Sequence, residues 1–280
     1  MFPARLPALA LSCLMALGAL TPAHACGTAE DDLCETANGA YRISQPAEHK
    51  RGAMIWLHGW GGSANGAMKN TGFRDRLAAR GMAYVALDGR ITSDRYKNKN
   101  WAVNDGRNYE RNDVAFVAEV VEDLVARHGI DRDRILLAGF SRGGSMVWDV
   151  ACRAPDVVRA YAPVAGAFWE PMWDSCEGPV DLFHTHGWTD RTVPLEGRPL
   201  GGGVMTQGDV FQSLYILRES NGCGNRQPES GPVDGDRWTR IWSDCEAGRI
   251  DFTLHPGGHS IPRGWLDQTL DWFEARMAES

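Results

Sequence analysis

The stretch RILLAGFSRGGSMVWDV (residues 134–150) joins an apolar run to a helix-compatible segment through GFSRGG (residues 139–144). Within it, GFSRG fits the pattern G-x-S-x-G, in which a nucleophilic serine lies on a tight turn between a buried strand and a helix. The glycines permit the turn, and the turn exposes the hydroxyl of Ser141. A helix N-cap serine beside turn glycines is the alternative interpretation. The strand before Ser141 and the helix after it favour the nucleophile.

Apolar, β-branched runs alternate with amphipathic segments along the chain. Several runs are apolar almost throughout, as in strands that are covered on both faces. Alternation of this kind predicts an α/β fold with a mostly parallel central sheet and helices on both faces. We expect strands at residues 39–45, 53–58, 83–88, 134–140, 160–165, 180–186 and 249–255, and helices at 63–80, 112–128 and 263–277.

The N-terminus has the features of a secretory signal peptide. Arg5 is its only charge, Leu6 to Leu20 is apolar, and Ala23-His24-Ala25 has the small-x-small form of a cleavage site. We expect residues 1–25 to be a signal peptide and residues 26–280 to form one catalytic domain. The protein is then secreted or periplasmic, and the sequence does not choose between the two.

Charge and hydropathy exclude several kinds of partner. The formal net charge is −7, and the chain has no basic run. Nucleic acid and anionic membrane surfaces are therefore poor partners. No later segment is apolar and long enough to predict a membrane span. The sequence does not indicate the oligomeric state.

The cysteine count favours disulfides. The chain has seven cysteines, and Cys13 leaves with the signal peptide, so an even number remains in an exported protein. The pairs that lie closest in sequence are Cys26–Cys34, Cys152–Cys176 and Cys223–Cys245. The sequence does not fix the connectivity, so this pairing is a prediction.

A base for Ser141 is expected after the serine in the chain, because a hydroxyl needs a base to become a good nucleophile. His259 lies in HPGGHSIPRGW, between the last strand and the last helix, where a glycine-rich loop brings an imidazole over the sheet edge. His255 is the alternative, but its place at the strand end favours packing.

The acid of the same triad is expected between the serine and the histidine. Asp190 lies in HTHGWTDRTVP, four residues after the strand that ends at His186. Asp149 lies inside the helix after Ser141, and Asp88 precedes the serine. The sequence therefore predicts a triad of Ser141, Asp190 and His259 at the carboxyl ends of the strands.

Two backbone N–H groups are needed to bind a developing oxyanion. The first is expected at Arg142, directly after the serine. The second is expected in the loop HGWGG (residues 58–62), at Trp60 first and Gly61 next. A plain glycine turn is the alternative interpretation of this loop.

Tryptophans on loops at the same edge suggest an aromatic cleft. Trp169, Trp173 and Trp188 follow expected strands, and the chain has eleven tryptophans in all. Such a cleft suits a sugar or phenolic ester. Loop packing is an equally good interpretation of each single tryptophan.

Five motifs together resemble one family. They are LHGWGGSA, NDVAFVAEVVEDLVARHGIDRDRI, GFSRGGSM, HGWTDRTVP and PGGHSIP, in this order along the chain. The set resembles the secreted α/β-hydrolase esterases grouped with polyhydroxybutyrate depolymerases and feruloyl or acetylxylan esterases. The resemblance implies an α/β-hydrolase fold without a large separate cap domain, and serine esterase activity on short-chain, feruloyl, acetyl or hydroxyalkanoate esters. It implies no cofactor and no metal. Arg142 stands where this family often has asparagine or another residue, which leaves the backbone donor and adds a charge.

Two other functions compete with this one. GWGGSA (residues 59–64) fits a dinucleotide-binding turn, with Asp88 at the right distance to hold a ribose, which would make an NAD-dependent oxidoreductase. His184 and His186 alternate on a strand and, with Asp190, suggest a metal-dependent hydrolase. Export argues against the first function, and the absence of a third local ligand argues against the second.

Overall fold

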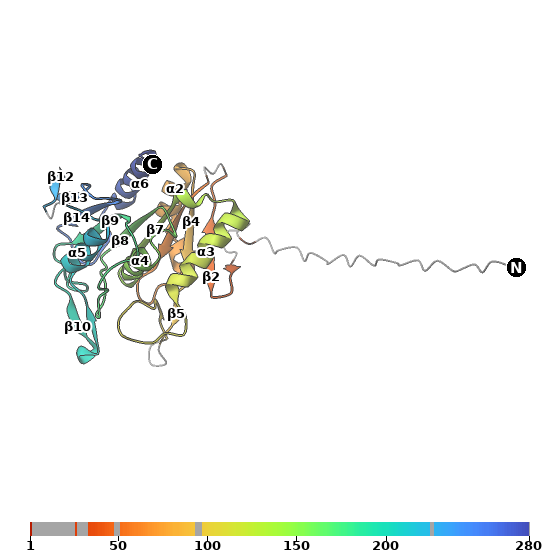
Figure 1. Cartoon of the computed structure of the whole chain (residues 1–280), viewed down its shortest axis with the longest axis horizontal. Helices are drawn as coiled ribbons and strands as arrows, with labels where there is room; N and C mark the ends of the chain where they lie inside the picture. Colours follow the sequence, from red (N-terminus) through yellow and green to blue (C-terminus); the bar gives the residue numbers. More distant parts are fainter. Residues whose placement is uncertain (2–25, 27–32, 48–50, 93–96, 225–226, 280) are drawn as a thin grey trace.

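The computed structural model shows a body of strands and helices (Figure 1). The expected signal peptide, residues 1–25, lies outside the described residues apart from Met1. The structure describes residues 1, 26, 33–47, 51–92, 97–224 and 227–279.

A ten-stranded sheet forms the centre of the fold. Its strand order is β1-β2-β4-β3-β7-β8-β9-β14-β13-β12. The six strands from β4 to β14 run parallel to one another, and the strands at both edges are antiparallel. The mostly parallel sheet predicted from the apolar runs is confirmed. The strands are β1 (Leu33–Glu35), β2 (Ala40–Ser44), β3 (Gly52–Leu57), β4 (Met82–Leu87), β7 (Ile135–Phe140), β8 (Ala160–Val164), β9 (Asp181–Gly187), β12 (Glu229–Asp234), β13 (Arg237–Trp242) and β14 (Arg249–His255).

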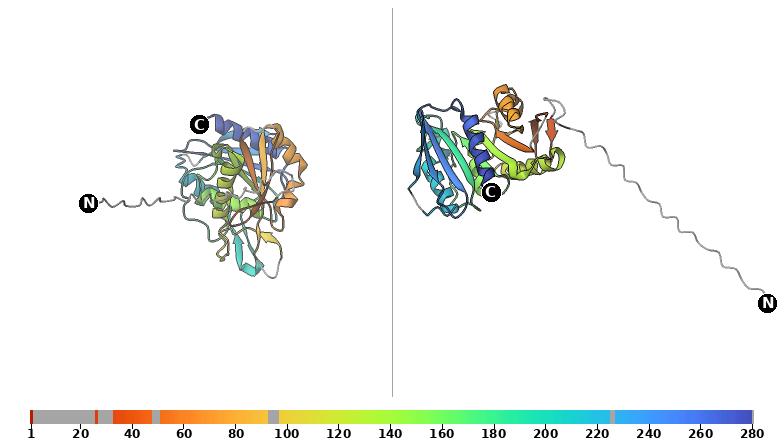
Figure 2. Two further views of the ribbon diagram at one scale, coloured as in Figure 1. Left: turned by 90° about the vertical axis from the view of Figure 1, so that its right-hand side faces the viewer. Right: turned by 90° about the horizontal axis from the view of Figure 1, so that it is seen from above.

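Helices cover both faces of the sheet (Figure 2). The buried side chains accordingly form two hydrophobic clusters, one on each face. The first cluster takes apolar residues from α3 (Asp113–His128), α4 (Arg142–Arg153) and α5 (Val210–Ser220). The second takes them from α1 (Ala64–Met68), α2 (Thr71–Ala79) and α6 (Trp265–Ala278). Burial on both faces explains why the central strands lack polar alternation.

Helix capping explains where the sequence prediction succeeds and where it is wrong. The helix expected at 112–128 is confirmed as α3, with Asn112 as N-cap and Gly129 at a left-handed φ of 64° at its end. The single helix expected at 63–80 is wrong. Ser63 caps α1, and the Asn70 side chain accepts a hydrogen bond from the Phe73 N–H to start α2 as a separate helix.

The additions to this core within the described residues are small. Two hairpins extend from it, and short 3₁₀ turns occur at η1 (Arg132–Arg134) and η2 (Gly201–Gly203). None of these additions is a separate cap domain, which agrees with the fold expected from the resemblance. Among the helices that the structure describes, none has the length and apolarity to cross a membrane. The hairpins are β5 (Arg90–Ile91) with β6 (Lys99–Asn100), and β10 (Arg198–Leu200) with β11 (Met205–Gln207).

Three disulfides join segments of the described chain. They are Cys26–Cys34, Cys152–Cys176 and Cys223–Cys245, the pairing that sequence proximity favoured. Cys152–Cys176 ties the last turn of α4 to the loop before β9, and Cys223–Cys245 bridges the segments that follow α5 and β13.

We expect the chain that starts at Cys26 to contain no free thiol and to lose thermal stability on reduction. Removing a native disulfide costs roughly 2–5 kcal/mol in small secreted domains, and less is expected in a larger core. Alkylation followed by mass spectrometry, with and without prior reduction, measures the thiols. Alkylation of all the cysteines without reductant would refute the pairing.

Candidate active site

Ser141 lies on the strained turn that the G-x-S-x-G pattern predicts. It stands between β7 and α4 with φ 57° and ψ −121°, which is rare for a residue with a side chain. A Cβ added at Gly143 would lie 2.1 Å from the Leu57 carbonyl oxygen, and one at Gly139 would lie 2.6 Å from the Gly143 carbonyl oxygen. The glycines are therefore required because backbone passes where side chains would be.

Ser141, His259 and Asp190 form a chain of hydrogen bonds at the carboxyl ends of the strands. The His259 Nε2 atom lies 2.8 Å from Ser141 Oγ, and His259 Nδ1 lies 2.7 Å from Asp190 Oδ2. His259 comes from the loop between β14 and α6, and Asp190 from the loop after β9. The Phe140 ring packs on the imidazole with 4.8 Å between ring centroids. The three side chains expected to act together therefore lie in contact, although they are far apart in sequence.

The surroundings of Asp190 keep its carboxylate charged and oriented. Its side chain is fully buried, and its Oδ1 atom accepts hydrogen bonds from the N–H groups of Thr192 and Val193 at 2.8 and 2.9 Å. Burial opposes ionisation, but the hydrogen bonds from His259 and Val193 outweigh it, and the pKa of Asp190 is lowered. A charged Asp190 is suited to hold the proton of His259 on Nδ1.

His184 and His186 extend this chain into the core. Both are fully buried. His184 Nδ1 lies 3.0 Å from the Pro163 carbonyl oxygen, the two histidines are joined Nε2 to Nδ1 at 3.1 Å, and His186 Nε2 lies 2.8 Å from the Val193 carbonyl oxygen. The lowered pKa values of both histidines keep the rings neutral, so each ring donates its single N–H to a carbonyl oxygen, and the Nε2–Nδ1 contact joins the two remaining nitrogens. The pair supports the Asp190 loop, and this use of the ring nitrogens argues against the metal hypothesis.

The remaining histidine candidate, His255, lies away from the serine. It is buried, and its Nδ1 atom accepts a hydrogen bond from the Gly257 N–H at 3.2 Å. It therefore packs beneath the loop that carries His259, as its place at the strand end predicts.

The loop after β3 lies beside Ser141. A Cβ added at Gly59 would lie 3.4 Å from Ser141 Cβ. The N–H of Gly61 donates to the Lys99 carbonyl oxygen at 2.9 Å, so it is used within the fold. Gly61, the second donor considered in this loop, is thus engaged with Lys99, and the donor role of Trp60 stays a prediction.

Asp88 has a structural role at this edge. Its Oδ1 atom accepts a hydrogen bond from the Ala64 N–H at 2.8 Å and pairs with Lys99 Nζ at 2.8 Å. These contacts fix the start of α1, which has only five residues. The carboxylate that the dinucleotide hypothesis assigns to a ribose is thus engaged with the protein itself.

The three expected cleft tryptophans differ in exposure. Trp169 is a correction: it is 7% exposed, donates from Nε1 to Ser145 Oγ at 3.0 Å and packs against the Arg142 guanidinium, so it belongs to the core. Trp173 is half-buried, and its Nε1 atom donates to Asp149 at 2.9 Å. Trp188 is exposed.

Trp188, one of the tryptophans expected in a cleft, lines a small cavity. The cavity has a volume of about 130 Å³ and also contains Trp238 and His255 in its wall. Trp238 is exposed like Trp188, and it lies on β13, a strand missed by the sequence analysis. β13 lies between β14 and β12, and its sequence RWTRIW lacks the regular apolar alternation that would predict a strand.

Asp149 is a buried carboxylate in α4, outside the triad. It accepts hydrogen bonds from the N–H of Asn104 at 2.8 Å and from Trp173. Burial raises its pKa from 3.8 to about 6, and these hydrogen bonds only partly offset the effect. Between about pH 4 and about pH 6, the folded state therefore keeps the proton of Asp149, whereas the unfolded state has already lost it.

This raised pKa predicts how the Asp149→Asn variant responds to pH. The ionised carboxylate destabilises the fold, and the penalty grows as pH rises from about 4 to about 6 and is complete above that range. We expect the difference in Tm, variant minus parent, to increase by a few degrees from about pH 4 to about pH 8. Thermal unfolding measures the shift, and exposed Asp267→Asn is the control. A pH-independent difference would contradict the prediction.

Comparison with known proteins places this geometry among hydrolases. A family model described as prolyl oligopeptidase family matches residues 73–196. Feruloyl esterase C of Emericella nidulans is 28% identical over 91% of this chain and 91% of its own, and feruloyl esterase D of Neurospora crassa is 24% identical over 90% and 87%.

Solved structures show the same fold. Acetyl xylan esterase from Aspergillus awamori matches with a TM-score of 0.61 at 15% identity, over 85% of this chain and 94% of that one. The Bacillus cereus carboxylesterase matches with a TM-score of 0.58 at 10% identity, over 86% and 96%. The sheet order, the serine turn and these similarities agree, and the chain is an esterase of the α/β-hydrolase type.

Proposed function

We propose that the protein is a serine carboxylic ester hydrolase that works through Ser141, His259 and Asp190. The observation that carries the proposal is the pair of hydrogen bonds that links Asp190 to His259 and His259 to Ser141. The order serine, acid, histidine along the chain supports the same assignment.

In the proposed reaction, Ser141 Oγ attacks the ester carbonyl carbon while His259 Nε2 takes its proton. The tetrahedral intermediate then expels the alcohol, which receives this proton from His259, and an acyl-enzyme remains on Ser141. Water, deprotonated by His259, then attacks the acyl-enzyme, the bond to Ser141 Oγ breaks, and Oγ regains the proton from His259 as the acid is released. Asp190 holds the proton on Nδ1 and stabilises the imidazolium. The residues supply the whole reaction without a cofactor.

The oxyanion is bound by backbone N–H groups in this proposal. The N–H of Arg142 is in the first turn of α4, whose positive dipole end faces the serine. The N–H of Trp60 supplies the second donor from the loop beside Ser141. Both groups are fixed before the substrate arrives, which is what makes such donors effective.

The names of similar proteins support a substrate class. The two similar curated proteins described above are named feruloyl esterases, and a similar structure is named an acetyl xylan esterase. We propose ester substrates with short acyl, acetyl, feruloyl or hydroxyalkanoate groups, including esters on oligosaccharides. A panel of soluble esters of these four kinds, with a p-nitroanilide peptide as comparison, tests the class. Hydrolysis should continue in EDTA and without NAD. Cleavage of the peptide but of no ester would overturn the proposal.

We also propose that Trp188 and Trp238 bind a sugar or phenolic ring of the substrate. The cavity between them is built on the same two loops as the site, because the Trp188 N–H donates to the His255 carbonyl oxygen at 2.7 Å and the Thr189 N–H donates to that of Gly257 at 3.1 Å. Both side chains are more than half exposed and free of the core, which suits stacking on a ring.

The Trp188→Ala variant tests this ring site. Aromatic stacking contributes about 0.5–1.5 kcal/mol, so we expect KM to rise up to about 10-fold for a feruloylated or acetylated sugar. For p-nitrophenyl acetate, which has no second ring group to reach the cavity, we expect less than about a 2-fold change. Phe211→Ala, at an exposed aromatic outside the cavity, is the matched control. An equal change with both substrates would contradict the ring site.

Export is part of the proposal. Three disulfides in the described chain are typical of proteins that fold in an oxidising compartment. We propose cleavage after Ala25 and release to the periplasm or the medium. N-terminal sequencing of the protein from each fraction tests it, and a cytoplasmic protein that retains residues 1–25 would contradict it.

A further inference from the structure

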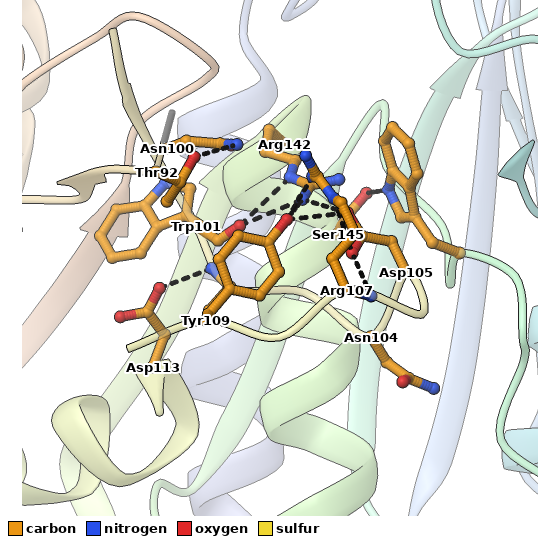
Figure 3. A network of polar contacts seen from close by, with 12 residues as sticks. Thr92, Asn100, Trp101, Asn104, Asp105, Arg107, Tyr109, Asp113, Arg142 and Ser145 are labelled. Atoms are coloured by element: carbon orange, nitrogen blue, oxygen red, sulfur yellow. Dashed lines mark hydrogen bonds and ion pairs between the residues drawn. The ribbon is translucent and has the colours of Figure 1, made fainter. Parts of the chain in front are cut away.

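The Arg142 side chain is buried at the centre of a polar network next to Ser141 (Figure 3). Its Nε and Nη2 atoms donate to the Trp101 carbonyl oxygen at 3.3 and 3.2 Å. Nη2 also donates to Asp105 at 2.7 Å and to the Tyr109 hydroxyl at 2.8 Å. The guanidinium carbon lies 4.3 Å from the centre of the Trp169 ring. These contacts leave the side chain one position.

The charge of Arg142 is balanced where it is buried. The Asp105 side chain is fully buried and pairs with both Arg142 and the half-exposed Arg107. Burial disfavours the charged carboxylate, but the hydrogen bond from Arg107 and the charge of Arg142 lower the pKa of Asp105. A buried pair of this kind contributes little net stability but is costly to break on one side. The role of the Arg142–Asp105 pair is therefore explained better by the geometry that it imposes on its neighbours than by net stability.

That geometry extends to the loop proposed to bind the oxyanion. The Trp101 Nε1–H donates to the His58 carbonyl oxygen at 2.7 Å, and the Lys99 carbonyl oxygen accepts the Gly61 N–H at 2.9 Å. Residues 99–101 thus hold the residues on both sides of the Gly59–Trp60 pair. The Arg142 side chain in turn donates hydrogen bonds to the backbone carbonyl oxygen of Trp101, the last residue of this segment.

We propose that Arg142 is a positioning residue whose side chain fixes, through Trp101, the loop that presents the Trp60 N–H to the oxyanion. The inference rests on the proposed esterase function and extends it. One residue then sets the spacing of both donors, because the Arg142 backbone supplies the first and its side chain places the second.

The Arg142→Met variant tests this role while keeping the length and the backbone N–H of the residue. Removing one oxyanion donor costs about 10²–10³-fold in kcat, and a misplaced donor costs less. We expect kcat per active site to fall about 10- to 10²-fold with KM changed less than about 3-fold, because the oxyanion exists only in the transition state. Active sites are counted by fluorophosphonate titration, so that loss of folded protein is not read as loss of rate.

A transition-state analogue separates positioning from general damage. A trifluoromethyl ketone forms a hemiketal oxyanion on Ser141, so its Ki should weaken in parallel with kcat in the Arg142→Met variant. Arg107→Met is the matched control, because Arg107 pairs with the same Asp105 and its side-chain hydrogen bonds go to Asp105 and the Tyr109 hydroxyl. It should retain kcat and Ki within about 2-fold.

A second variant keeps the test decisive if Arg142→Met does not fold. Trp101→Phe removes the Nε1–H donor to His58 and keeps an aromatic ring in the buried site. The same selective loss in kcat and Ki is expected. Wild-type kcat and Ki in both variants, while Ser141→Ala is inactive, would overturn the positioning role and leave the esterase proposal intact. Activity in Ser141→Ala would instead overturn the proposed serine esterase mechanism on which the positioning role rests.

Discussion

The Ser141→Ala variant is expected to lose ester hydrolysis by at least ~10³-fold, because every step of the proposed reaction passes through the Ser141 oxygen. The fold should persist. Alanine meets the same positive φ as serine and adds no atom to the tight turn, and the structure gives Ser141 no side-chain capping bond to α4. Rates on a soluble ester, with circular dichroism to establish folding, measure the effect.

Ser260→Ala is the matched control for this variant. Ser260 is exposed on the loop that carries His259, next to the imidazole in sequence but outside its hydrogen bonds. We expect its kcat to lie within about 2-fold of the parent, as for a surface change away from the chemistry. Near-normal turnover by folded Ser141→Ala would remove the serine mechanism.

The Asp190→Asn variant should lose about 10³- to 10⁴-fold in kcat, the second largest effect expected. Its Oδ1 atom still accepts from Thr192 and Val193, so the loop keeps its geometry. The amide then points an N–H group at His259 Nδ1 where a carboxylate accepted a proton. The imidazole is forced into the tautomer that cannot take the serine proton at Nε2.

Asp181→Asn is the control for this change. Asp181 begins the strand β9 that Asp190 follows, and it pairs with Arg159 at the opposite edge of the sheet. The control should lose stability rather than kcat per active site, because the broken pair lies away from the site. Equal kcat in Asp190→Asn and the parent would show that another group orients His259.

The central fold was predictable because the signals are local. Runs such as β3 and β7 are apolar along their whole length, and strands covered on both faces typically have that pattern. The candidate triad was predictable for a related reason. In a parallel sheet, residues just after successive strands lie at the same end of the sheet. The places of Ser141, Asp190 and His259 directly after strands therefore predicted that they lie together, and their side-chain chemistry predicted a triad. Their catalytic roles remain predictions that the variants above test.

Other features depend on contacts that sequence patterns do not encode. The break between α1 and α2 follows from the Asn70 cap, which competes with a continuous helical pattern. The burial of Trp169 depends on Arg142, and Arg142 depends on Asp105 in a loop without regular structure. Trp238 lies on β13, where exposed side chains alternate with partly buried ones and apolar periodicity is weak. Each of these features needs a partner that is distant in sequence.

A covalent probe tests the central claim most directly. An alkyl fluorophosphonate reacts with a serine that is activated by a histidine, and trypsin releases residues 135–142 as one peptide that contains Ser141. The account predicts a single adduct on this peptide, with loss of ester hydrolysis in proportion to labelling and no adduct in Ser141→Ala. Full ester hydrolysis in the completely labelled protein, or an adduct on another residue that accounts for the loss, would contradict it.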